Sequence, residues 1–308
     1  MNIIALGAHM VDVLVRPVDA IPEGQNTALV EDIRMTAAGT AAGTALTLAK
    51  LGATVRTTGA IGDDPTGDLL LSLLQRAGVG TELIVRKAGV ATSATVLPIR
   101  PNGERPTLHL LGANLAYELA DVPWDALAGA DHVHVGGPEL LGPDKAAAIL
   151  KHAKEHGATT SVDLIAPGSM GHIDAIRATL PFIDYLLPND DQVLGFTATQ
   201  DLEAGAKVLL EAGVGMVAAT CGADGAVLIG ADATLRVPAF AIDVVDTTGC
   251  GDAFSAGFVV GIALGRSARD AAVLGSAAAA LVAQGLGSDA GDFDLAAADA
   301  FAAATPTR

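Results

Sequence analysis

The stretch that says most about the fold reads Asp246-Thr247-Thr248-Gly249-Cys250-Gly251-Asp252-Ala253-Phe254. It follows a strand-like apolar run, Ala241–Val245, and opens a predicted helix at about Gly251–Leu264. A Gly-X-Gly turn at the start of a helix exposes several backbone N–H groups in one direction, and the helix dipole adds partial positive charge there. The pattern therefore predicts an anion site of the kind that holds a phosphoryl group.

Asp252 lies in the first turn of that helix, beside the predicted anion site. Phosphoryl transfer needs charge stabilisation on the moving group and a base that takes a proton from the attacking hydroxyl. The N–H groups around Gly249, Cys250 and Gly251 would supply the first, and the Asp252 carboxylate the second. A simpler interpretation is that Asp252 only stabilises the start of the helix. The stretch alone leaves both interpretations open.

Outward from this stretch, predicted strands and helices alternate along most of the chain. Regular alternation of this kind predicts an α/β fold, in which a mostly parallel sheet is covered by helices on both faces. The predicted strands are Ile3–Leu6, Val55–Gly59, His132–Val135, Thr159–Asp163, Ile183–Leu187 and Met216–Thr220. The predicted helices are Ala41–Lys50, Thr66–Arg76, Pro143–His156, Leu202–Glu211, Gly251–Leu264 and Ala268–Gln284, with one more in the tail after Gly291.

Two regions, 11–36 and 91–111, break the alternation. Each contains two extended segments with no helix between them, and Pro101-Asn102-Gly103 is a turn signal in the second region. We expect a small antiparallel sheet that forms a lid over a site at the strand ends, within a single domain spanning 1–308. The extended segments are Val11–Val18, Thr27–Met35, Ala91–Ile99 and Thr107–Leu111.

Composition narrows the class of protein. The chain has 35 acidic and 18 basic side chains, a net charge of −17, which disfavours a nucleic-acid partner. Its two cysteines, Cys221 and Cys250, form neither a zinc motif nor a disulfide framework, so we expect a reduced, cytoplasmic setting. No apolar stretch approaches the roughly 20 residues that a membrane span needs.

The stretch 246–252 resembles the second signature of the PfkB (ribokinase-like) carbohydrate kinases, Asp-Thr-X-Gly-Ala-Gly-Asp, with Cys250 in place of Ala. Further segments resemble this family in order along nearly the whole chain. The resemblance implies a ribokinase-like three-layer α/β/α fold and ATP-dependent phosphorylation of a hydroxymethyl group on a sugar or nucleoside. The further segments are Gly7–Asp12, Gly39–Gly43, Leu48–Gly52, Gly59–Asp64, Gly67, Gly78, Leu111–Asn114, Pro188–Asp191 and Thr220–Gly225.

The resemblance also assigns site residues. Asp252 would be the base, with the turn at Gly249, Cys250 and Gly251 as the anion hole. Asp12 and Gly39 would contact acceptor hydroxyls. The ATP side would include Asn189, Thr220, Gly222, Gly225 and Ser276. Asp246 and Thr248, with the backbone near 285–288, resemble a monovalent-cation site for K⁺ found in some members.

Four positions depart from the family. Ala38 replaces the first of the paired glycines, and the other three bear on substrate and metal. Met10 and Gly43 stand where the sugar kinases often have Asn, so hydrogen-bond partners for the acceptor are lost. This favours a nucleoside or an unusual sugar over ribose, and the few basic residues near the lid disfavour a phosphosugar. Gln192 stands where Glu usually orders Mg²⁺ and its waters, so it keeps hydrogen bonds but loses a charge.

Several weaker features of the sequence allow other interpretations. Glu139 either lines the acceptor pocket or is a solvated residue at a helix start. His152–His156 matches a zinc-peptidase pattern, but basic residues in a last helical turn explain it better. Ser255 lies inside a helix, and a hydrolase that uses it is a remote alternative. A non-catalytic metabolite sensor with the same fold is the second hypothesis, favoured only by Gln192. Members of the family often pair their lids, which suggests a homodimer.

Overall fold

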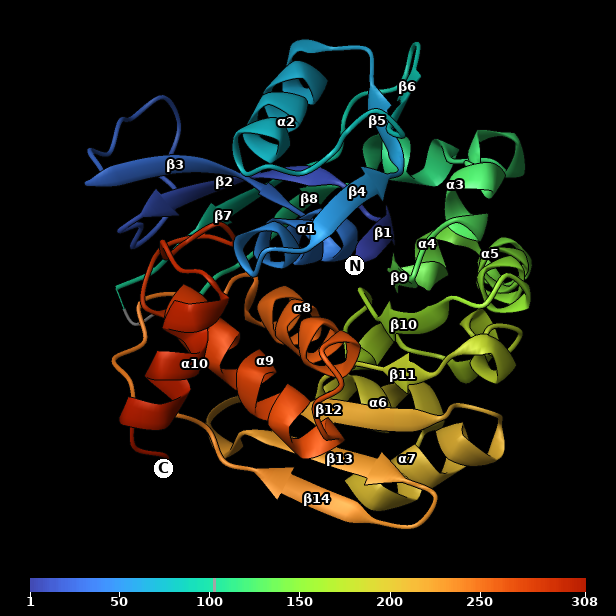
Figure 1. Ribbon diagram of the computed structural model, residues 1–308. Coiled ribbons are helices and arrows are strands. Elements are labelled where there is room, and N and C mark those ends of the chain that lie inside the picture. The colour runs from blue at the N-terminus through green and yellow to red at the C-terminus, as the bar shows by residue number, and fades with distance from the viewer. Residues whose placement is uncertain (102–103) are drawn as a thin grey trace.

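The computed structural model describes residues 1–101 and 104–308, and its centre is a sheet of eight strands. The strands are β1 (Asn2–Gly7), β4 (Thr54–Thr58), β9 (His132–Gly136), β10 (Thr159–Asp163), β11 (Tyr185–Leu186), β12 (Met216–Thr220), β13 (Ala226–Gly230) and β14 (Thr234–Val237). Their order is β14-β13-β12-β11-β10-β9-β1-β4 (Figure 1). Neighbours from β4 to β12 pair in parallel, whereas β13 and β14 are antiparallel. The predicted, mostly parallel sheet is confirmed.

Helices cover both faces of this sheet because its strands bury alternate side chains on opposite sides. In β1, Ile3 and Ala5 belong to one core, and Ile4 and Leu6 belong to the other. A strand buried on both faces is a continuous apolar run, which is the pattern of residues 3–6. One face carries α1 (Thr40–Lys50), α2 (Pro65–Arg76), α8 (Cys250–Ala263), α9 (Ala268–Ala283) and α10 (Leu295–Ala304). The other carries α3 (Trp124–Ala128), α4 (Pro138–Leu141), α5 (Pro143–Glu155), α6 (Asp190–Thr197) and α7 (Leu202–Glu211).

The two regions that break the alternation form a separate four-stranded sheet. We call this sheet the lid, and its role in covering a site stays a prediction. Its strands are β2 (Met10–Arg16), β3 (Asp32–Ala38), β7 (Ala94–Pro98) and β8 (Leu108–Leu110), in the order β3-β2-β7-β8. The outer pairs are antiparallel, but the central pair β2–β7 is parallel, so the sheet is mixed. This happens because each hairpin places its first strand at the centre. Asn102 and Gly103 of the predicted turn lie outside the described residues. Short strands β5 (Ala60–Gly62) and β6 (Val85–Lys87) pair separately.

The two faces of the lid differ in polarity. The inner row, which lies side by side across the four strands, consists of Thr36, Asp12, Thr95 and His109. The neighbouring row, which strand alternation turns to the opposite face, consists of Met35, Val13, Val96 and Leu108. We call this second set the outer lid row. Its end members Met35 and Leu108 are 50% and 62% exposed. Such exposure is unusual for large apolar side chains that belong to one row of a sheet.

Near the end of the sheet, one sequence prediction fails and one hairpin was missed. The apolar run Ala241–Val245 is not a strand; only Phe240 makes a β-bridge, to Thr307. Its apolar side chains instead include Ile242 and Val244, which line a cavity. The hairpin β13–β14 was not predicted, because its strands are short and a tight turn, not a helix, joins them.

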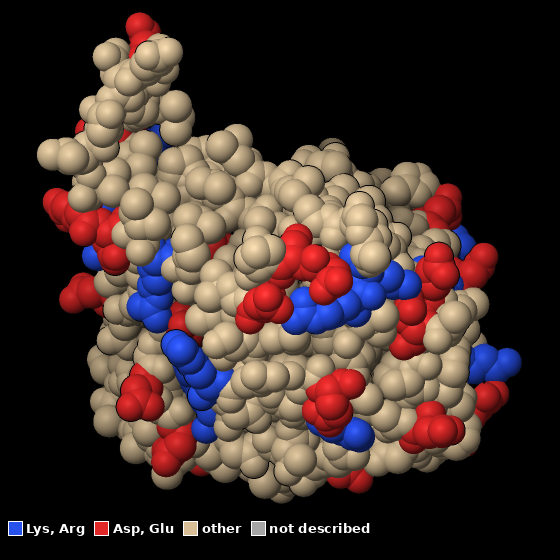
Figure 2. All heavy atoms as spheres, turned by 90° about the horizontal axis from the view of Figure 1, so that it is seen from above, with Lys and Arg blue, Asp and Glu red and all other residues tan. Residues whose placement is uncertain are grey.

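The distribution of charged side chains on the surface agrees with the acidic composition of the sequence. On the face drawn in Figure 2, basic side chains are scattered among acidic ones without a continuous basic area. The absence of a nucleic-acid partner stays a prediction. Among the described residues, no helix is long and apolar enough to cross a membrane.

Candidate active site

The start of α8 is shaped by a buried carboxylate and two glycines. Asp246, whose side chain is 1% exposed, accepts hydrogen bonds from Thr248 N (3.0 Å), Thr248 Oγ1 (2.8 Å) and Gly287 N (2.9 Å). Gly249 precedes the helix with φ +76°, and a Cβ there would lie 2.6 Å from the neighbouring loop. Gly251 faces open space. The turn is therefore held on one side and accessible on the other.

The N–H groups of this turn divide into engaged and available donors. Cys250 N donates to Thr247 O at 3.3 Å. The N–H groups of Gly249, Gly251 and Asp252 have no acceptor within the described part of the chain. Unpaired N–H groups at a helix start are the donors that a phosphoryl oxygen can use. Of the three N–H groups expected from the sequence, those of Gly249 and Gly251 are available, and the N–H of Asp252 is available beside them.

Three carboxyl groups come together at this helix start. Burial, and then the charges of Asp163 and Asp12, raise the pKa of Asp252 well above its ordinary value. Asp163 ends β10, and burial raises its pKa to about 8 against a hydrogen bond from Ser255 Oγ. Burial also raises the pKa of Asp12, on lid strand β2, to about 6. Asp163 was missed from the sequence, although an acid at the carboxyl end of a parallel strand was a usable signal.

Several buried polar side-chain atoms have no hydrogen-bond partner among the described residues. Buried polar groups normally have partners, so each exception suggests a place for water or a ligand. Four such atoms lie on lid strand β2, at the start of α1, just after β8 and on α4: Asp12 Oδ1, Thr40 Oγ1, Asn114 Nδ2 and Glu139 Oε2. Asn114 sits in the turn Gly112–Ala116, and its Oδ1 accepts from His9 N at 2.9 Å. Asn114 belongs to a segment that resembles the family, but the sequence analysis gave it no role.

Glu139 is not the solvated helix-start residue that one interpretation of the sequence described. Its Oε1 accepts hydrogen bonds from Ile165 N (3.0 Å) and Ala166 N (3.1 Å). Its Oε2 is buried, and burial raises the pKa of the group. Its place in the acceptor pocket stays a prediction.

The other acceptor-side residues are small or apolar. Gly39 has φ +99° and packs on Ala8, where a Cβ would lie 2.5 Å from the Ala8 carbonyl oxygen. Met10 is 7% exposed, and its Sδ accepts from Thr95 Oγ1 at 3.4 Å. Gly43, on α1, directly faces Asp252. Neither Met10 nor Gly43 offers an amide to a ligand.

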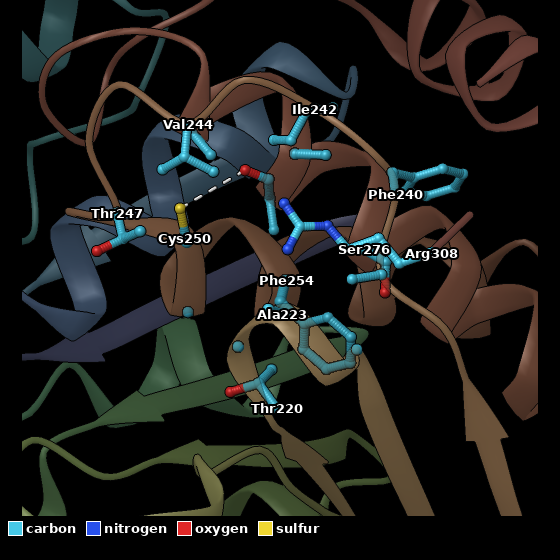
Figure 3. Close-up of a pocket in the computed structure, with 17 residues that line it drawn as sticks. Thr220, Ala223, Phe240, Ile242, Val244, Thr247, Cys250, Phe254, Ser276 and Arg308 are labelled. Atoms are coloured by element: carbon cyan, nitrogen blue, oxygen red, sulfur yellow. Dashed lines mark hydrogen bonds between the residues drawn. The ribbon is translucent and has the colours of Figure 1, made fainter. Parts of the chain in front are cut away.

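A cavity of about 300 Å³ lies on the other side of the α8 start. Thr220, Gly222, Gly225 and Ser276, which the sequence assigned to the ATP side, all line it. The wall is otherwise mostly apolar, as Figure 3 shows, and the guanidinium of Arg308 extends into it. Arg308 is held there by a bond from its N to Ala239 O (2.9 Å). The sequence gave no signal for this residue.

Asn189 and Gln192 do not line this cavity; they close the start of α6. Asn189 pairs its backbone with Thr220, and its Oδ1 accepts from Gln192 N at 2.7 Å. Gln192 Oε1 accepts from Asn189 N (2.9 Å), and Nε2 donates to Leu164 O (3.0 Å) and Ala166 O (3.1 Å). Both Nε2 hydrogens are used, so a role near magnesium would fall to the second lone pair of Oε1, which could accept a hydrogen bond from a metal-bound water.

The signals that the sequence analysis set aside have structural explanations. His152 Nε2 lies 3.1 Å from Trp124 O, and the described residues contain no group of three His, Cys, Asp or Glu side chains arranged to hold a metal. Ser255 is fully buried and bonded to Asp163. Burial raises the pKa of Cys250 to about 12, so its thiol stays protonated and unreactive.

The arrangement places a carboxyl group and free N–H donors between a cavity and a set of unpaired polar atoms. The model of the pfkB family carbohydrate kinases matches residues 2–293. The chain belongs to this family. As a pfkB-family member it is a sugar or nucleoside kinase, as the sequence predicted, and a non-catalytic sensor is not favoured.

Known proteins similar to this pfkB-family chain differ in substrate. The ATP-dependent ribose-1-phosphate kinase of Halopiger xanaduensis is 32% identical over 260 residues, covering 84% of each chain. The adenosine kinase of Schizosaccharomyces pombe is 27% identical over 70% of each chain. The solved ribokinase of Arabidopsis thaliana, complexed with ribose and ATP, is similar in fold with a TM-score of 0.84, 23% identity and 98% coverage of each chain. The ribokinase-like fold predicted from the sequence is confirmed.

Proposed function

We propose that this protein transfers the γ-phosphoryl group of ATP to a hydroxymethyl group, with Asp252 as the base. The observation that carries the proposal is the position of Asp252 at the α8 start, with the cavity that contains Thr220 and Ser276 on one side and Asp12 on the other. Asp252 would take the proton of the acceptor hydroxyl while its oxygen attacks the γ-phosphorus and the bond to the ADP oxygen breaks. The raised pKa of Asp252 makes its carboxylate a stronger base toward the acceptor hydroxyl.

The free N–H groups of Gly249, Gly251 and Asp252 would stabilise the charge on the moving phosphoryl group. Magnesium would be held mainly by the ATP phosphates and water, the usual arrangement for this ion in kinases. The lack of a three-ligand metal cluster among the described residues is compatible with that mode of binding. In this role Mg²⁺ would neutralise part of the phosphate charge.

For the acceptor, we propose a ribofuranose with a free hydroxymethyl group and a substituent on C1. Ribose 1-phosphate and adenosine, which appear in the names of two relatives, share this chemistry. Met10 and Gly43, which lack amides, support a site that makes fewer hydrogen bonds to the sugar than a free-ribose site. The phosphosugar that the sequence disfavoured therefore returns as a candidate beside a nucleoside.

The test is an ATP-consumption screen of the purified protein with Mg²⁺ against sugars, sugar 1-phosphates and nucleosides. We expect one acceptor class well above background, and a loss of about 10²- to 10⁴-fold in kcat for Asp252→Asn with ATP binding retained. The matched control is Asp270→Asn, which removes an exposed acid from the first turn of α9. If Asp252 only stabilised its helix, the two variants would behave alike. Metabolite binding without turnover across the panel would favour the sensor.

We also propose that two copies pair through their lids. The outer lid row supports this, because three of its apolar side chains, Met35, Val96 and Leu108, are exposed in a single copy. Covering such a row is a usual way to protect an apolar sheet face from water.

A further inference from the structure

Arg105 extends from the lid to the turn that opens α8. Its Nη1 donates to Asp246 Oδ1 at 3.2 Å and also to Thr248 Oγ1, and its Nη2 donates to Thr247 Oγ1 at 2.7 Å. All three acceptors belong to the stretch that shapes the anion site. The lid and the anion site are therefore joined by one guanidinium group.

The positive charge of Arg105 compensates the buried negative charge of Asp246. The Asp246 side chain is 1% exposed, and a buried carboxylate is costly unless a positive charge and hydrogen bonds compensate it. Arg105, whose side chain is 30% exposed, is its ion-pair partner. Arginine suits the position because its planar fork reaches several oxygens together.

This arrangement does not fit the monovalent-cation site that the sequence suggested at Asp246 and Thr248. Asp246 Oδ1 already accepts from Arg105 and from both donors of Thr248, and Oδ2 accepts from Gly287 N. A cation bound to the same oxygens would stand against the guanidinium, and the like charges would repel. The residues present therefore leave no suitable place for K⁺.

We propose that Arg105 is a built-in cation that replaces K⁺ at Asp246, so that the reaction is independent of monovalent cations. Because Arg105 belongs to the lid, the positive charge reaches Asp246 only when the lid lies over the site. Arg105 is thus a positioning residue: it acts through Asp246 and the 246–248 turn, which hold the N–H groups of the anion site. The kinetic consequence of this inference rests on the proposed function, whereas the pairing of Arg105 with Asp246 does not.

The kinetic test compares turnover in KCl, NaCl and choline chloride at equal ionic strength. We expect equal rates for the natural protein, and a loss of about tenfold or more in kcat for Arg105→Met, because a buried charge is left without its partner. The matched control is Arg100→Met, which removes an exposed arginine of the same lid that pairs with Glu104. Stimulation of the natural protein by K⁺, or equal behaviour of the two variants, would overturn the inference.

Thermal unfolding provides a readout that needs no turnover. The melting temperature of the natural protein should be the same in KCl and choline chloride, whereas Arg105→Met should melt lower than Arg100→Met and recover partly in KCl. An Arg105→Met protein that melts like the control, or that ignores K⁺, contradicts the inference. If no acceptor is phosphorylated, the proposed function fails while the melting comparison still decides the role of Arg105.

Discussion

Gly43 on α1 and Asp252 on α8 are so close that a Cβ built on Gly43 would lie 2.1 Å from Asp252 Oδ2. No real Cβ tolerates that distance, so any side chain at position 43 must move the carboxylate. We expect Gly43→Ala to lower kcat by about 10²-fold, because a small displacement of a catalytic group is that costly. The measurement is steady-state kinetics with the acceptor found in the screen.

The control for this variant is Gly129→Ala, where the nearest atom to the new Cβ is 3.7 Å away. Gly129→Ala should leave kcat unchanged. If Gly43→Ala were equally active, the Asp252 carboxylate would not need its present position, and the role of base would be in doubt.

Burial of the Asp12 carboxyl lowers the stability of the folded protein. Its pKa rises from 3.8 to about 6 on folding because the carboxyl is buried. Between these values the folded protein binds more protons than the unfolded chain, so the free energy of unfolding decreases as the pH rises through this window. Asp12→Asn should therefore stabilise the protein by on the order of 1–3 kcal/mol at pH 7, and by much less near pH 4.

The same variant should lose acceptor binding, because the Asp12 side chain has an unpaired oxygen at the acceptor side. Urea unfolding at the two pH values and the KM for the acceptor test the two effects separately. If Asp12→Asn raised the free energy of unfolding equally at both pH values, the pKa of the Asp12 carboxyl would not be raised by folding.

Much of this fold was readable from the sequence because its signals are local. The strand Ile3–Leu6 and the helix that Gly249 precedes follow from apolar runs and turn residues next to one another in the chain. The contacts that define the site are not local. Gly43 with Asp252, and Arg105 with Asp246, join segments far apart in sequence, and no pattern within either segment reports the pairing.

The wrong strand at 241–245 has a related cause. An apolar run predicts burial, but it does not say against what. Here Ile242 and Val244 face a cavity instead of a neighbouring strand.

The Gln192 amide holds the start of α6 through its hydrogen bonds. These bonds allow the effect of Glu at this position to be predicted. The Nε2 group donates to Leu164 O and Ala166 O, whereas a carboxylate would bring negative charge to both carbonyl oxygens. We expect Gln192→Glu to lower the free energy of unfolding by about 1–3 kcal/mol, because two buried acceptors lose their donor. Urea unfolding of the variant, with Gln284→Glu at the exposed residue that follows α9 as a control, measures this. If Gln192→Glu were instead neutral and bound Mg·ATP more tightly, the position would serve the metal.

Arg308 extends into the cavity assigned to the nucleotide, where it is the one basic residue among the lining residues that the structure describes. A cation in an otherwise apolar cavity can contact the face of a base or a phosphate oxygen. Arg308→Ala should raise the KM for ATP severalfold with little change in the KM for the acceptor. Arg269→Ala, on the first turn of α9 and outside the cavity, is the control. An unchanged KM for ATP would show that Arg308 only borders the site.

The outer lid row leads to a prediction about assembly. Met35 and Leu108 stand at its two ends with more than a third of each side chain exposed, and their partners Val13 and Val96 complete a continuous apolar face. If two copies cover this face, replacing Leu108 by Lys should force a charge into the interface and produce monomers. Light scattering after size-exclusion chromatography, over a range of concentrations, measures this directly. Leu264→Lys, at a 55% exposed position just after α8, should leave the dimer intact. A natural protein that stays monomeric at every concentration would rule out pairing through the lid.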